Sequence, residues 1–339
     1  MTTTKHRVAV LGGGSFGTAL ANIVADNEHD VVLWLRNAER AQEINERHVN
    51  TEYLPDFPLN PALRAETDLA AALRGSDIIF MAVPSGSCRD VAREAARSIK
   101  PGSILISTTK GIEANGFLLM SQVLREEIQG VRLGVMSGPN LAKEIAAKQL
   151  TATVIASVDD DLNATVQDLL HCGYFRVYAS NDMFGVELGG ALKNVYAIMS
   201  GMAAARGIGQ NTISMLLTRA LAEMSRFAVR MGADPLTFLG LSGVGDLIVT
   251  CMSPLSRNYQ VGYALGKGRD IESICAELGQ VAEGINTLKL LKARADALQV
   301  RMPLVNGLYE VLHNGRGVEQ VVGALMSGEQ NRDVEFALK

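Results

Sequence analysis

The chain has 339 residues, of which 47% are hydrophobic and 20% are charged, so it is long enough for about two globular domains with sizeable cores. Its formal net charge of −4 argues against a nucleic-acid-binding surface, where a basic stripe is expected. The scattered cysteines form no CxxC pair and the histidines form no cluster, so we expect free thiols and no metal site; the cysteines are Cys88, Cys172, Cys251 and Cys275.

The basic N-terminus and the apolar run after it resemble a secretory signal peptide, but the apolar run is too short. Residues 12–15 are Gly-Gly-Gly-Ser and interrupt the apolar run after residues 8–11, whereas a signal peptide needs about 7–15 apolar residues in a row. No stretch approaches the ~20 apolar residues of a membrane span. We therefore expect a cytoplasmic protein.

The first half of the chain alternates short apolar runs with helix-periodic sequence. The runs are rich in Val, Ile and Leu, as strands of a parallel sheet buried on both faces must be; they are residues 8–11, 31–35, 78–83, 104–107 and 133–136. Residues 151–156 and 175–178 are candidates to extend the sheet. This pattern predicts a doubly wound α/β domain over residues 1–180.

The second half is helical in pattern, with almost no strand signal. Helices are predicted over residues 184–205, 213–231, 271–278 and 287–297. Residues 180–182, Ser-Asn-Asp, suit the N-cap of the first of these helices, so the domain boundary is placed there. We expect residues 181–339 to form an all-helical domain that binds the substrate.

Residues 12–17, Gly-Gly-Gly-Ser-Phe-Gly, match the GxGxxG fingerprint of dinucleotide-binding domains. The motif follows a predicted strand and opens a predicted helix, as the fingerprint requires. Gly12 permits the tight turn, Gly14 lets the backbone approach a pyrophosphate, and Gly17 allows close packing of helix and strand. The free N–H groups at the helix start then face the phosphates. The alternative is a tight turn with only a structural role.

Arg36 ends the second predicted strand, where an NAD-binding protein usually has Asp or Glu for the ribose 2′-hydroxyl. A guanidinium suits a 2′-phosphate instead, with Arg40 as a possible second contact. The sequence therefore favours NADP, with NAD also possible. The alternative is that Arg36 is a solvated charge at a helix start.

Lys193 is the cation of the predicted helix over residues 184–205. Its helical neighbours include Gly189, Gly190 and Ala197, and the two glycines cost the helix roughly 1 kcal/mol each relative to alanine. We expect this arrangement to leave empty space around the ammonium for a ligand. The alternative is a structural lysine paired with Glu187 or another acid.

Two further segments of the second half contain candidate functional residues. Asp246 lies in a glycine-rich turn beside an apolar run, where it is expected to be buried and to pair with Lys193. Ser256, Arg257 and Asn258 together resemble a helix start, whose donors suit a phosphate monoester. An ordinary helix cap is the alternative for these three residues.

Two segments of the first half follow predicted strands and so lie where ligands bind in open α/β sheets. Lys110 comes after residues 104–107, and the run Ser-Gly-Pro-Asn of residues 137–140 comes after residues 133–136. Both are candidate ligand contacts, and a plain turn is the alternative for each.

Taken together these segments resemble the NAD(P)-dependent glycerol-3-phosphate dehydrogenases of the bacterial type. The matching stretches run in the family's order over nearly the whole chain: GGGSFGTALA from Gly12, TTKGIE from Thr108, SGPN from Ser137, GGALKNVYAI from Gly189, SGVGDLIVTC from Ser242, SRN from Ser256 and VAEG from Val281. The resemblance implies a Rossmann domain, a helical C-terminal domain, a role in supplying phospholipid precursors, and a homodimer.

The resemblance also implies roles for individual residues. Lys193 is similar to the family's catalytic proton acceptor. The substrate contacts would be Lys110, Gly138, Asn140, Lys193, Asp246, Ser256, Arg257 and Asn258. The cofactor contacts would be Gly12, Gly14, Ser15, Phe16, Gly17, Arg36, Lys110, Ala142, Arg257, Val281 and Glu283. Asn140 stands where the family commonly has Ser or Thr.

The implied reaction interconverts dihydroxyacetone phosphate and sn-glycerol 3-phosphate by hydride transfer with NADP or NAD. One alternative is another two-domain dehydrogenase of the 3-hydroxyacid or ketopantoate type. Such an enzyme shares the fingerprint, but it does not need residues like 256–258 to bind a phosphate. An alternative of a different class is a non-enzymatic NAD(P) sensor, which has no need of Lys193.

Overall fold

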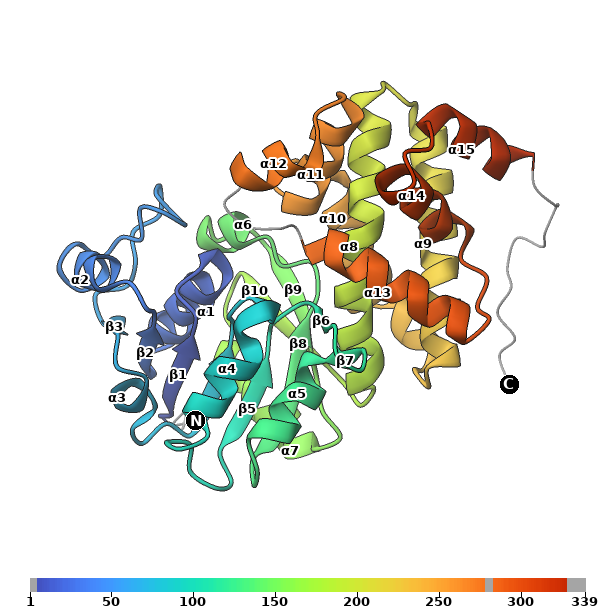
Figure 1. Cartoon of the computed structure of the whole chain (residues 1–339). Helices are drawn as coiled ribbons and strands as arrows, with labels where there is room; N and C mark the ends of the chain where they lie inside the picture. The colour runs from blue at the N-terminus through green and yellow to red at the C-terminus, as the bar shows by residue number, and fades with distance from the viewer. Residues whose placement is uncertain (1–4, 278–282, 328–339) are drawn as a thin grey trace. The chain divides into compact units, whose positions relative to one another are not determined.

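The computed structural model describes residues 5–277 and 283–327 and shows two compact units, Met1–Glu187 and Leu188–Lys339. The first unit contains an eight-stranded sheet in the order β10-β9-β8-β5-β4-β1-β2-β3 (Figure 1). Its strands are β1 (Arg7–Leu11), β2 (Asp30–Trp34), β3 (Arg64–Glu66), β4 (Ile78–Met81), β5 (Ile104–Ser107), β8 (Arg132–Ser137), β9 (Thr151–Ala156) and β10 (Phe175–Ser180). A small antiparallel pair, β6 (Ile112–Glu113) and β7 (Leu118–Leu119), lies apart from it.

The strands predicted from the sequence are all present, and β3, β6 and β7 are additions. Neighbouring strands run parallel except β8 and β9, which pair antiparallel through Val135 and Ala156. The central strands β4 and β5 are buried along their whole length. Burial on both faces explains their unbroken apolar sequence.

Helices cover both faces of this sheet, as Figure 1 shows. One face packs against α1 (Ser15–Asp26), α2 (Ala38–Arg47), α6 (Ala142–Ala146) and α7 (Asp160–Leu170). The other packs against α3 (Leu69–Leu73), α4 (Ser85–Ala95) and α5 (Met120–Glu127). The first unit is therefore a doubly wound α/β domain.

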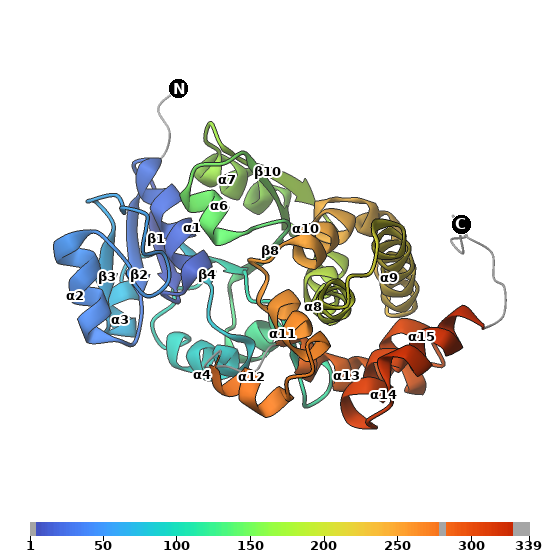
Figure 2. The same cartoon turned by 90° about the horizontal axis from the view of Figure 1, so that it is seen from above.

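The second unit is helical. Helix α8 (Met183–Ala205) begins in the first unit and continues into the second; the others are α9 (Gln210–Arg230), α10 (Asp246–Met252), α11 (Arg257–Gly266), α12 (Ile271–Glu277), α13 (Glu283–Ala297), α14 (Pro303–His313) and α15 (Val318–Met326). A 3₁₀ turn, η1 (Pro235–Leu239), and a π turn, η2 (Leu241–Gly245), precede α10. Figure 2 looks nearly along α8 and α9, which lie side by side and are joined by a hydrogen bond of 3.3 Å from the Tyr196 hydroxyl to Glu223.

Glycines allow α11 to pack directly on α8. A Cβ atom on Gly262 would lie 1.9 Å from the Ile198 carbonyl oxygen, and one on Gly201 would lie 2.1 Å from the Tyr259 carbonyl oxygen. Side chains at these positions would force the two helices apart. The contact therefore fixes the first turn of α11 relative to α8.

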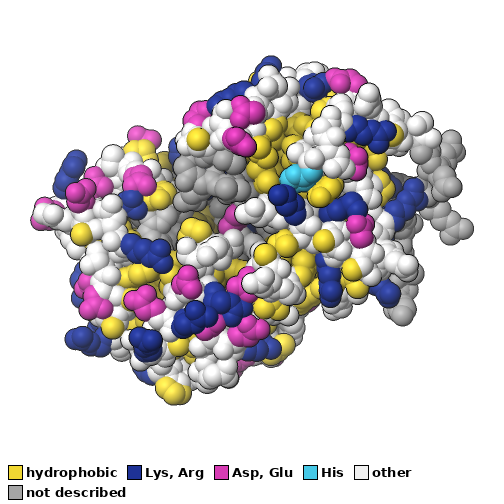
Figure 3. All heavy atoms as spheres, viewed as in Figure 1, with side chains coloured by type: hydrophobic (Ala, Val, Ile, Leu, Met, Phe, Trp, Pro, Cys, Tyr) yellow, Lys and Arg dark blue, Asp and Glu magenta, His cyan; other side chains and the backbone are white. Residues whose placement is uncertain are grey.

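The surface carries both signs of charge. Over the face drawn in Figure 3, basic and acidic side chains are intermixed. In the first unit Arg89 forms ion pairs of 2.6 Å with Glu113 and 2.7 Å with Glu127. Of the described helices, none combines the length and apolar character needed to cross a membrane.

Candidate active site

The glycine-rich turn between β1 and α1 has the geometry that a dinucleotide requires. Gly12 adopts φ +127°, and a Cβ there would lie 2.5 Å from the Ala82 carbonyl oxygen. A Cβ on Gly17 would lie 2.0 Å from the Gly12 carbonyl oxygen, so Gly17 is needed for the close contact between helix and strand. Gly14 differs, because a Cβ there would meet nothing within 4 Å. The space beside Gly14 lies directly at the start of α1, where backbone N–H groups attract a phosphate.

Asn50 supports this turn, although it belongs to none of the motifs described above. Its amide nitrogen donates to the Gly13 carbonyl at 3.1 Å and to the Thr18 hydroxyl at 2.8 Å, and the residue is fully buried. Ser15 donates its hydroxyl to the Tyr53 carbonyl at 3.2 Å. Phe16 packs against the core of the first unit. The loop after α2 thus stabilises the glycine-rich turn through these hydrogen bonds.

Arg36 is exposed directly after β2, with its guanidinium 5.9 Å from the centre of the Trp34 ring. Arg40 is already engaged, because it pairs with Glu52 and lies 4.7 Å from the centre of the Tyr53 ring. Arg36 is therefore the better placed of the two for a phosphate on the ribose.

Lys110, Gly138 and Asn140 come together at the carboxyl ends of β5 and β8. The Lys110 ammonium donates to the Gly138 carbonyl at 3.3 Å. The Asn140 amide nitrogen donates to the Thr153 hydroxyl at 2.9 Å. The predicted substrate contacts of the first unit thus form one group. Ala142, a predicted cofactor contact, opens α6 beside them in the chain.

The predicted catalytic lysine lies in a buried polar cluster of the second unit. Lys193 is 4% exposed and forms an ion pair with Asp246, which is 1% exposed. Its ammonium also donates to the Thr250 hydroxyl at 2.7 Å. Asp246 and Thr250 lie on one face of α10 because they are four residues apart. The predicted pairing with Asp246 is confirmed, and Thr250 is an additional member of the cluster.

The interpretation of Gly189 as empty space beside the lysine is wrong. A Cβ on Gly189 would lie 2.9 Å from the Ser242 carbonyl oxygen, so backbone of η2 occupies that space. The glycine allows η2 to pack on α8, and α10 with Asp246 follows directly in the chain. The glycine therefore serves the ion pair and not the entry of a ligand.

Glu187 is not the partner of Lys193. Its carboxylate accepts hydrogen bonds from the Ser121 hydroxyl and, at 2.8 Å, from the Ser121 backbone N–H at the start of α5. Burial raises the pKa of this carboxyl to about 7. Near Lys193, burial raises the pKa of the Cys251 thiol to about 12, so this thiol stays neutral beside the ion pair.

The predicted phosphate contacts form a helix start, as expected. Ser256 is the N-cap of α11, and its hydroxyl accepts from the Tyr259 backbone N–H at 3.4 Å. Arg257 is exposed at the first position of the helix, whereas Asn258 is 9% exposed. The side-chain Oδ1 of Asn258 accepts from the Gly284 N–H at 3.0 Å. Glu283 begins α13, and Val281 lies outside the described residues.

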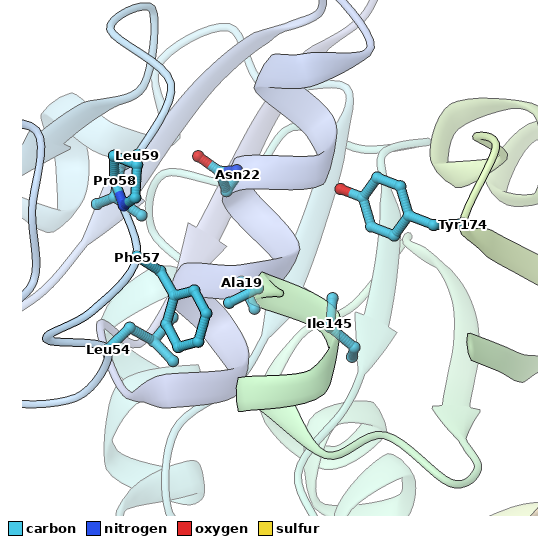
Figure 4. Close-up of a pocket in the computed structure, with 9 residues that line it drawn as sticks. Ala19, Asn22, Leu54, Phe57, Pro58, Leu59, Ile145 and Tyr174 are labelled. Carbon is cyan, nitrogen blue, oxygen red and sulfur yellow. The ribbon is translucent and has the colours of Figure 1, made fainter. Parts of the chain in front are cut away.

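The first unit contains a small pocket. It is lined by α1, the loop after α2, α6 and Tyr174 (Figure 4): Ala19, Asn22, Leu54, Phe57, Pro58, Leu59, Ile145, Ala146 and Tyr174. The polar side chain of Asn22 already accepts from the Asn60 N–H at 2.7 Å. The pocket contains no predicted site residue, and its lining serves the packing of α1.

Family models of known proteins match both halves of the chain. The model described as NAD-dependent glycerol-3-phosphate dehydrogenase N-terminus matches residues 7–163, and the model for the C-terminus of the same enzyme matches residues 182–323. The chain belongs to the NAD-dependent glycerol-3-phosphate dehydrogenase family. This membership does not favour a ketopantoate-type reductase.

Relatives of the family are similar over the full chain. A glycerol-3-phosphate dehydrogenase [NAD(P)+] of Ectopseudomonas mendocina is 59% identical, covering 98% of this chain and 98% of the relative. One of Azotobacter vinelandii is 59% identical, covering 98% and 97%. The crystal structure of glycerol-3-phosphate dehydrogenase from Coxiella burnetii superposes with a TM-score of 0.90 at 36% identity, covering 96% of this chain and 99% of that one.

The described residues fit the cofactor that the family name implies. The space at Gly14 and the start of α1 suit a pyrophosphate, and Arg36 stands where the ribose is bound in this fold. Within residues 5–277 and 283–327 no group of His, Cys, Asp or Glu has the arrangement of a metal site. The described cysteines Cys88, Cys172 and Cys251 are free thiols.

Proposed function

We propose that this chain interconverts dihydroxyacetone phosphate and sn-glycerol 3-phosphate, with Lys193 as the residue that exchanges the proton. The observation that carries the proposal is the buried cluster of Lys193, Asp246 and Thr250 in a member of this family. Residues 1–180 hold the dinucleotide, and residues 181–339 hold the reacting end of the substrate.

A dinucleotide held by the first unit would supply the hydride for reduction of the ketone carbon, or take it up in the reverse direction. Lys193 contacts the C2 oxygen and donates its proton as the ketone is reduced, and it accepts the proton during oxidation. Asp246 and Thr250 hold the ammonium, because their oxygen atoms accept its hydrogen bonds. Low solvent exposure strengthens the interaction of the ammonium with the developing negative charge on that oxygen.

The phosphate is held by the start of α11. Arg257 offers a planar guanidinium, and Ser256 and Asn258 flank it at the end of the helix where N–H groups are free. Within the first unit, Lys110 donates to the Gly138 carbonyl and is assigned as a further substrate contact by the family's motif. These assignments follow the positions that match the family's motifs.

Replacement of Lys193 by alanine tests the proposal. Loss of a general acid typically lowers kcat by about 10²–10⁴, while binding of the dinucleotide to the first unit is retained. Arg257→Ala is the matched variant, because it is expected to raise KM for the phosphorylated substrate with a smaller effect on kcat. Near-normal kcat in Lys193→Ala would contradict the assignment of the proton transfer.

Arg36 favours NADPH over NADH, because its exposed guanidinium is available for a 2′-phosphate. We expect Arg36→Ala to raise KM for NADPH while KM for NADH changes little. An unchanged ratio of the two KM values would remove Arg36 from this role. Arg40→Ala is the control, since Arg40 is already paired with Glu52.

We further propose that the protein acts in the cytoplasm as a homodimer and supplies glycerol phosphate for phospholipid synthesis. Support for a dimer includes exposed apolar side chains of the second unit, such as Leu239 at 61% and Met252 at 53%. Sedimentation equilibrium of the purified chain measures its mass directly, and a monomeric mass would contradict the dimer.

A further inference from the structure

The amide of Asn140 has one satisfied end and one unsatisfied end. Its nitrogen donates to the Thr153 hydroxyl at 2.9 Å. Its carbonyl oxygen, Oδ1, is buried and has no hydrogen-bond partner among the described residues. A buried acceptor without a donor costs about 1–3 kcal/mol. A ligand that brings a hydroxyl to this oxygen recovers that free energy.

Thr153 determines the orientation of the Asn140 side-chain amide. Thr153 is fully buried, and its hydroxyl donates its single hydrogen to the Ser137 carbonyl at 3.1 Å. The Thr153 oxygen can therefore only accept from Asn140, so it faces the amide nitrogen. The reversed amide would place two acceptors against each other. The hydrogen-bond network thus makes Oδ1 the amide atom that has no hydrogen-bond partner.

Gly138 contributes to this arrangement. A Cβ at Gly138 would lie 3.1 Å from both the Thr153 hydroxyl oxygen and the Thr153 Cα, and Gly138 adopts φ +155°. A larger residue would press on the hydroxyl that orients the amide. Lys110 donates to the carbonyl of the same glycine, so the cation lies beside the short segment that carries the acceptor.

The triose phosphate has one group that matches the unsatisfied oxygen. The ketone oxygen at C2 only accepts hydrogen bonds, and the phosphate mainly accepts them near neutral pH. The C1 hydroxyl is the donor. It needs an acceptor, which the cationic substrate contacts Lys110, Lys193 and Arg257 cannot provide, because ammonium and guanidinium groups have none.

The other side-chain oxygen groups of the predicted substrate contacts each already have a hydrogen-bond or ion-pair partner. The Asn258 Oδ1 accepts from the Gly284 N–H at 3.0 Å, and the Ser256 hydroxyl accepts from the Tyr259 N–H at 3.4 Å. Asp246 is paired with Lys193. Among the described substrate contacts, Asn140 is therefore the side chain with a buried oxygen that accepts no hydrogen bond.

We propose that Thr153 is a positioning residue, which orients the Asn140 amide so that Oδ1 accepts a hydrogen bond from the C1 hydroxyl of the substrate. The proposal rests on the proposed function, since it concerns the same substrate. It makes the pair Thr153–Asn140 a determinant of selectivity for hydroxylated over deoxygenated triose phosphates.

The experiment compares two substrates in four forms of the full-length enzyme. The substrates are dihydroxyacetone phosphate and its analogue in which the C1 hydroxyl is replaced by hydrogen. The enzymes are wild type, Asn140→Ala, Thr153→Val and Thr153→Ser. The readout is the ratio of kcat/KM for the two substrates, because a general structural defect lowers both values together and leaves their ratio unchanged.

Wild type is expected to prefer dihydroxyacetone phosphate by about tenfold, the equivalent of one hydrogen bond. Asn140→Ala and Thr153→Val lose most of this preference, whereas Thr153→Ser keeps it because serine retains the hydroxyl. An unchanged preference in Asn140→Ala overturns the inference, even when Thr153→Val fails to fold. A wild-type enzyme that does not reduce dihydroxyacetone phosphate overturns the proposed function first, and the two failures are therefore distinguishable.

Discussion

At the scale of single residues, the ion pair of Lys193 and Asp246 shows how the desolvation cost of a buried charge is offset. Each partner alone would pay a large desolvation penalty, and the Thr250 hydroxyl satisfies a further hydrogen of the ammonium. Such a pair does not by itself make a protein more stable than an apolar cluster of equal size. Both residues lie in stretches that match the family's motifs.

Asp246→Asn removes one charge of the pair and leaves the other buried. We expect the free energy of unfolding to fall by about 3–5 kcal/mol, because the lysine charge is then uncompensated, and kcat to fall as well. Urea unfolding measures the first effect. Asp77→Asn is the control, since Asp77 pairs with Lys100 at the surface with side chains 48% and 52% exposed, and such pairs contribute about 0–1 kcal/mol. Equal losses in both variants would contradict the argument.

Some of these residues could be predicted from the sequence and others could not. Asp246 was predicted to pair with Lys193 because an acid in a glycine-rich turn beside an apolar run is readily buried. Thr250 was missed, although its spacing of four residues from Asp246 is a usable signal. The role of Gly189 was misread because its neighbour, the Ser242 carbonyl, comes from a segment distant in the chain.

At the scale of elements, the apolar runs predicted the strands well because strands of a parallel sheet are buried on both faces. Strand β3 was missed because it has only three residues, Arg64–Glu66, two of them charged. The antiparallel direction of β9 was not predictable, since the alternation of side chains is the same in both directions. The start of α11 was predicted from its cap. Pro303 at the start of α14 is a usable signal that was missed, whereas α15 follows Gly317 without a side-chain cap.

The first turn of α13 depends on Gly284. A Cβ there would lie 2.6 Å from the Asn194 carbonyl oxygen and 2.8 Å from the Asn258 Oδ1. We expect Gly284→Ala to lower the free energy of unfolding by about 1–3 kcal/mol through overpacking. Gly323→Ala in α15 is the control, because a Cβ there meets nothing within 4 Å, and alanine favours a helix by about 1 kcal/mol. A stabilised Gly284→Ala would show that α13 does not pack this closely on α8.

The start of α5 depends on a buried carboxyl. Burial raises the pKa of Glu187 from 4.5 to about 7 in the folded protein, against the lowering effect of the Ser121 hydrogen bonds. Because the folded pKa is the higher one, the contribution of this group to stability is fully present below about pH 4.5 and is lost as the pH rises through about 7. The loss amounts to about 3 kcal/mol.

Glu187→Gln is expected to remove this pH dependence, because the amide does not ionise. Relative to wild type, the variant should gain about 3 kcal/mol of unfolding free energy between about pH 5 and about pH 8, as measured by urea unfolding at each pH. Glu46→Gln on the exposed face of α2 is the control and should show no such gain. Parallel pH profiles of wild type and Glu187→Gln would refute a raised pKa at this position.

At the scale of the whole molecule, each unit has its own kind of site. The first unit presents a glycine-rich turn and a helix start, which suit the phosphates of a dinucleotide. The second presents the buried ion pair and the start of α11. The sequence predicted this division of work because each motif lies within a segment of uniform pattern, whereas residues such as Asn50 and Thr153 act through contacts that only the fold creates.

Gly14→Val tests dinucleotide binding separately from the stability of the fold. The side chain fills the space beside the start of α1 without a clash, because a Cβ at Gly14 meets nothing within 4 Å and φ is −76°. We expect the melting temperature without ligand to change little, and the stabilisation by NADPH, about 2.7 kcal/mol at a hundredfold excess over Kd, to be largely lost.

Hydrogen exchange locates the effect. In wild type NADPH should protect the backbone amides of residues 12–18, and Gly14→Val should lose this protection while sn-glycerol 3-phosphate still protects the start of α11. Gly17→Ala is the contrasting variant, since its Cβ would lie 2.0 Å from the Gly12 carbonyl oxygen and should lower the melting temperature of the free protein. If Gly14→Val retained full NADPH protection of residues 12–18, the pyrophosphate would have to bind elsewhere than at this turn.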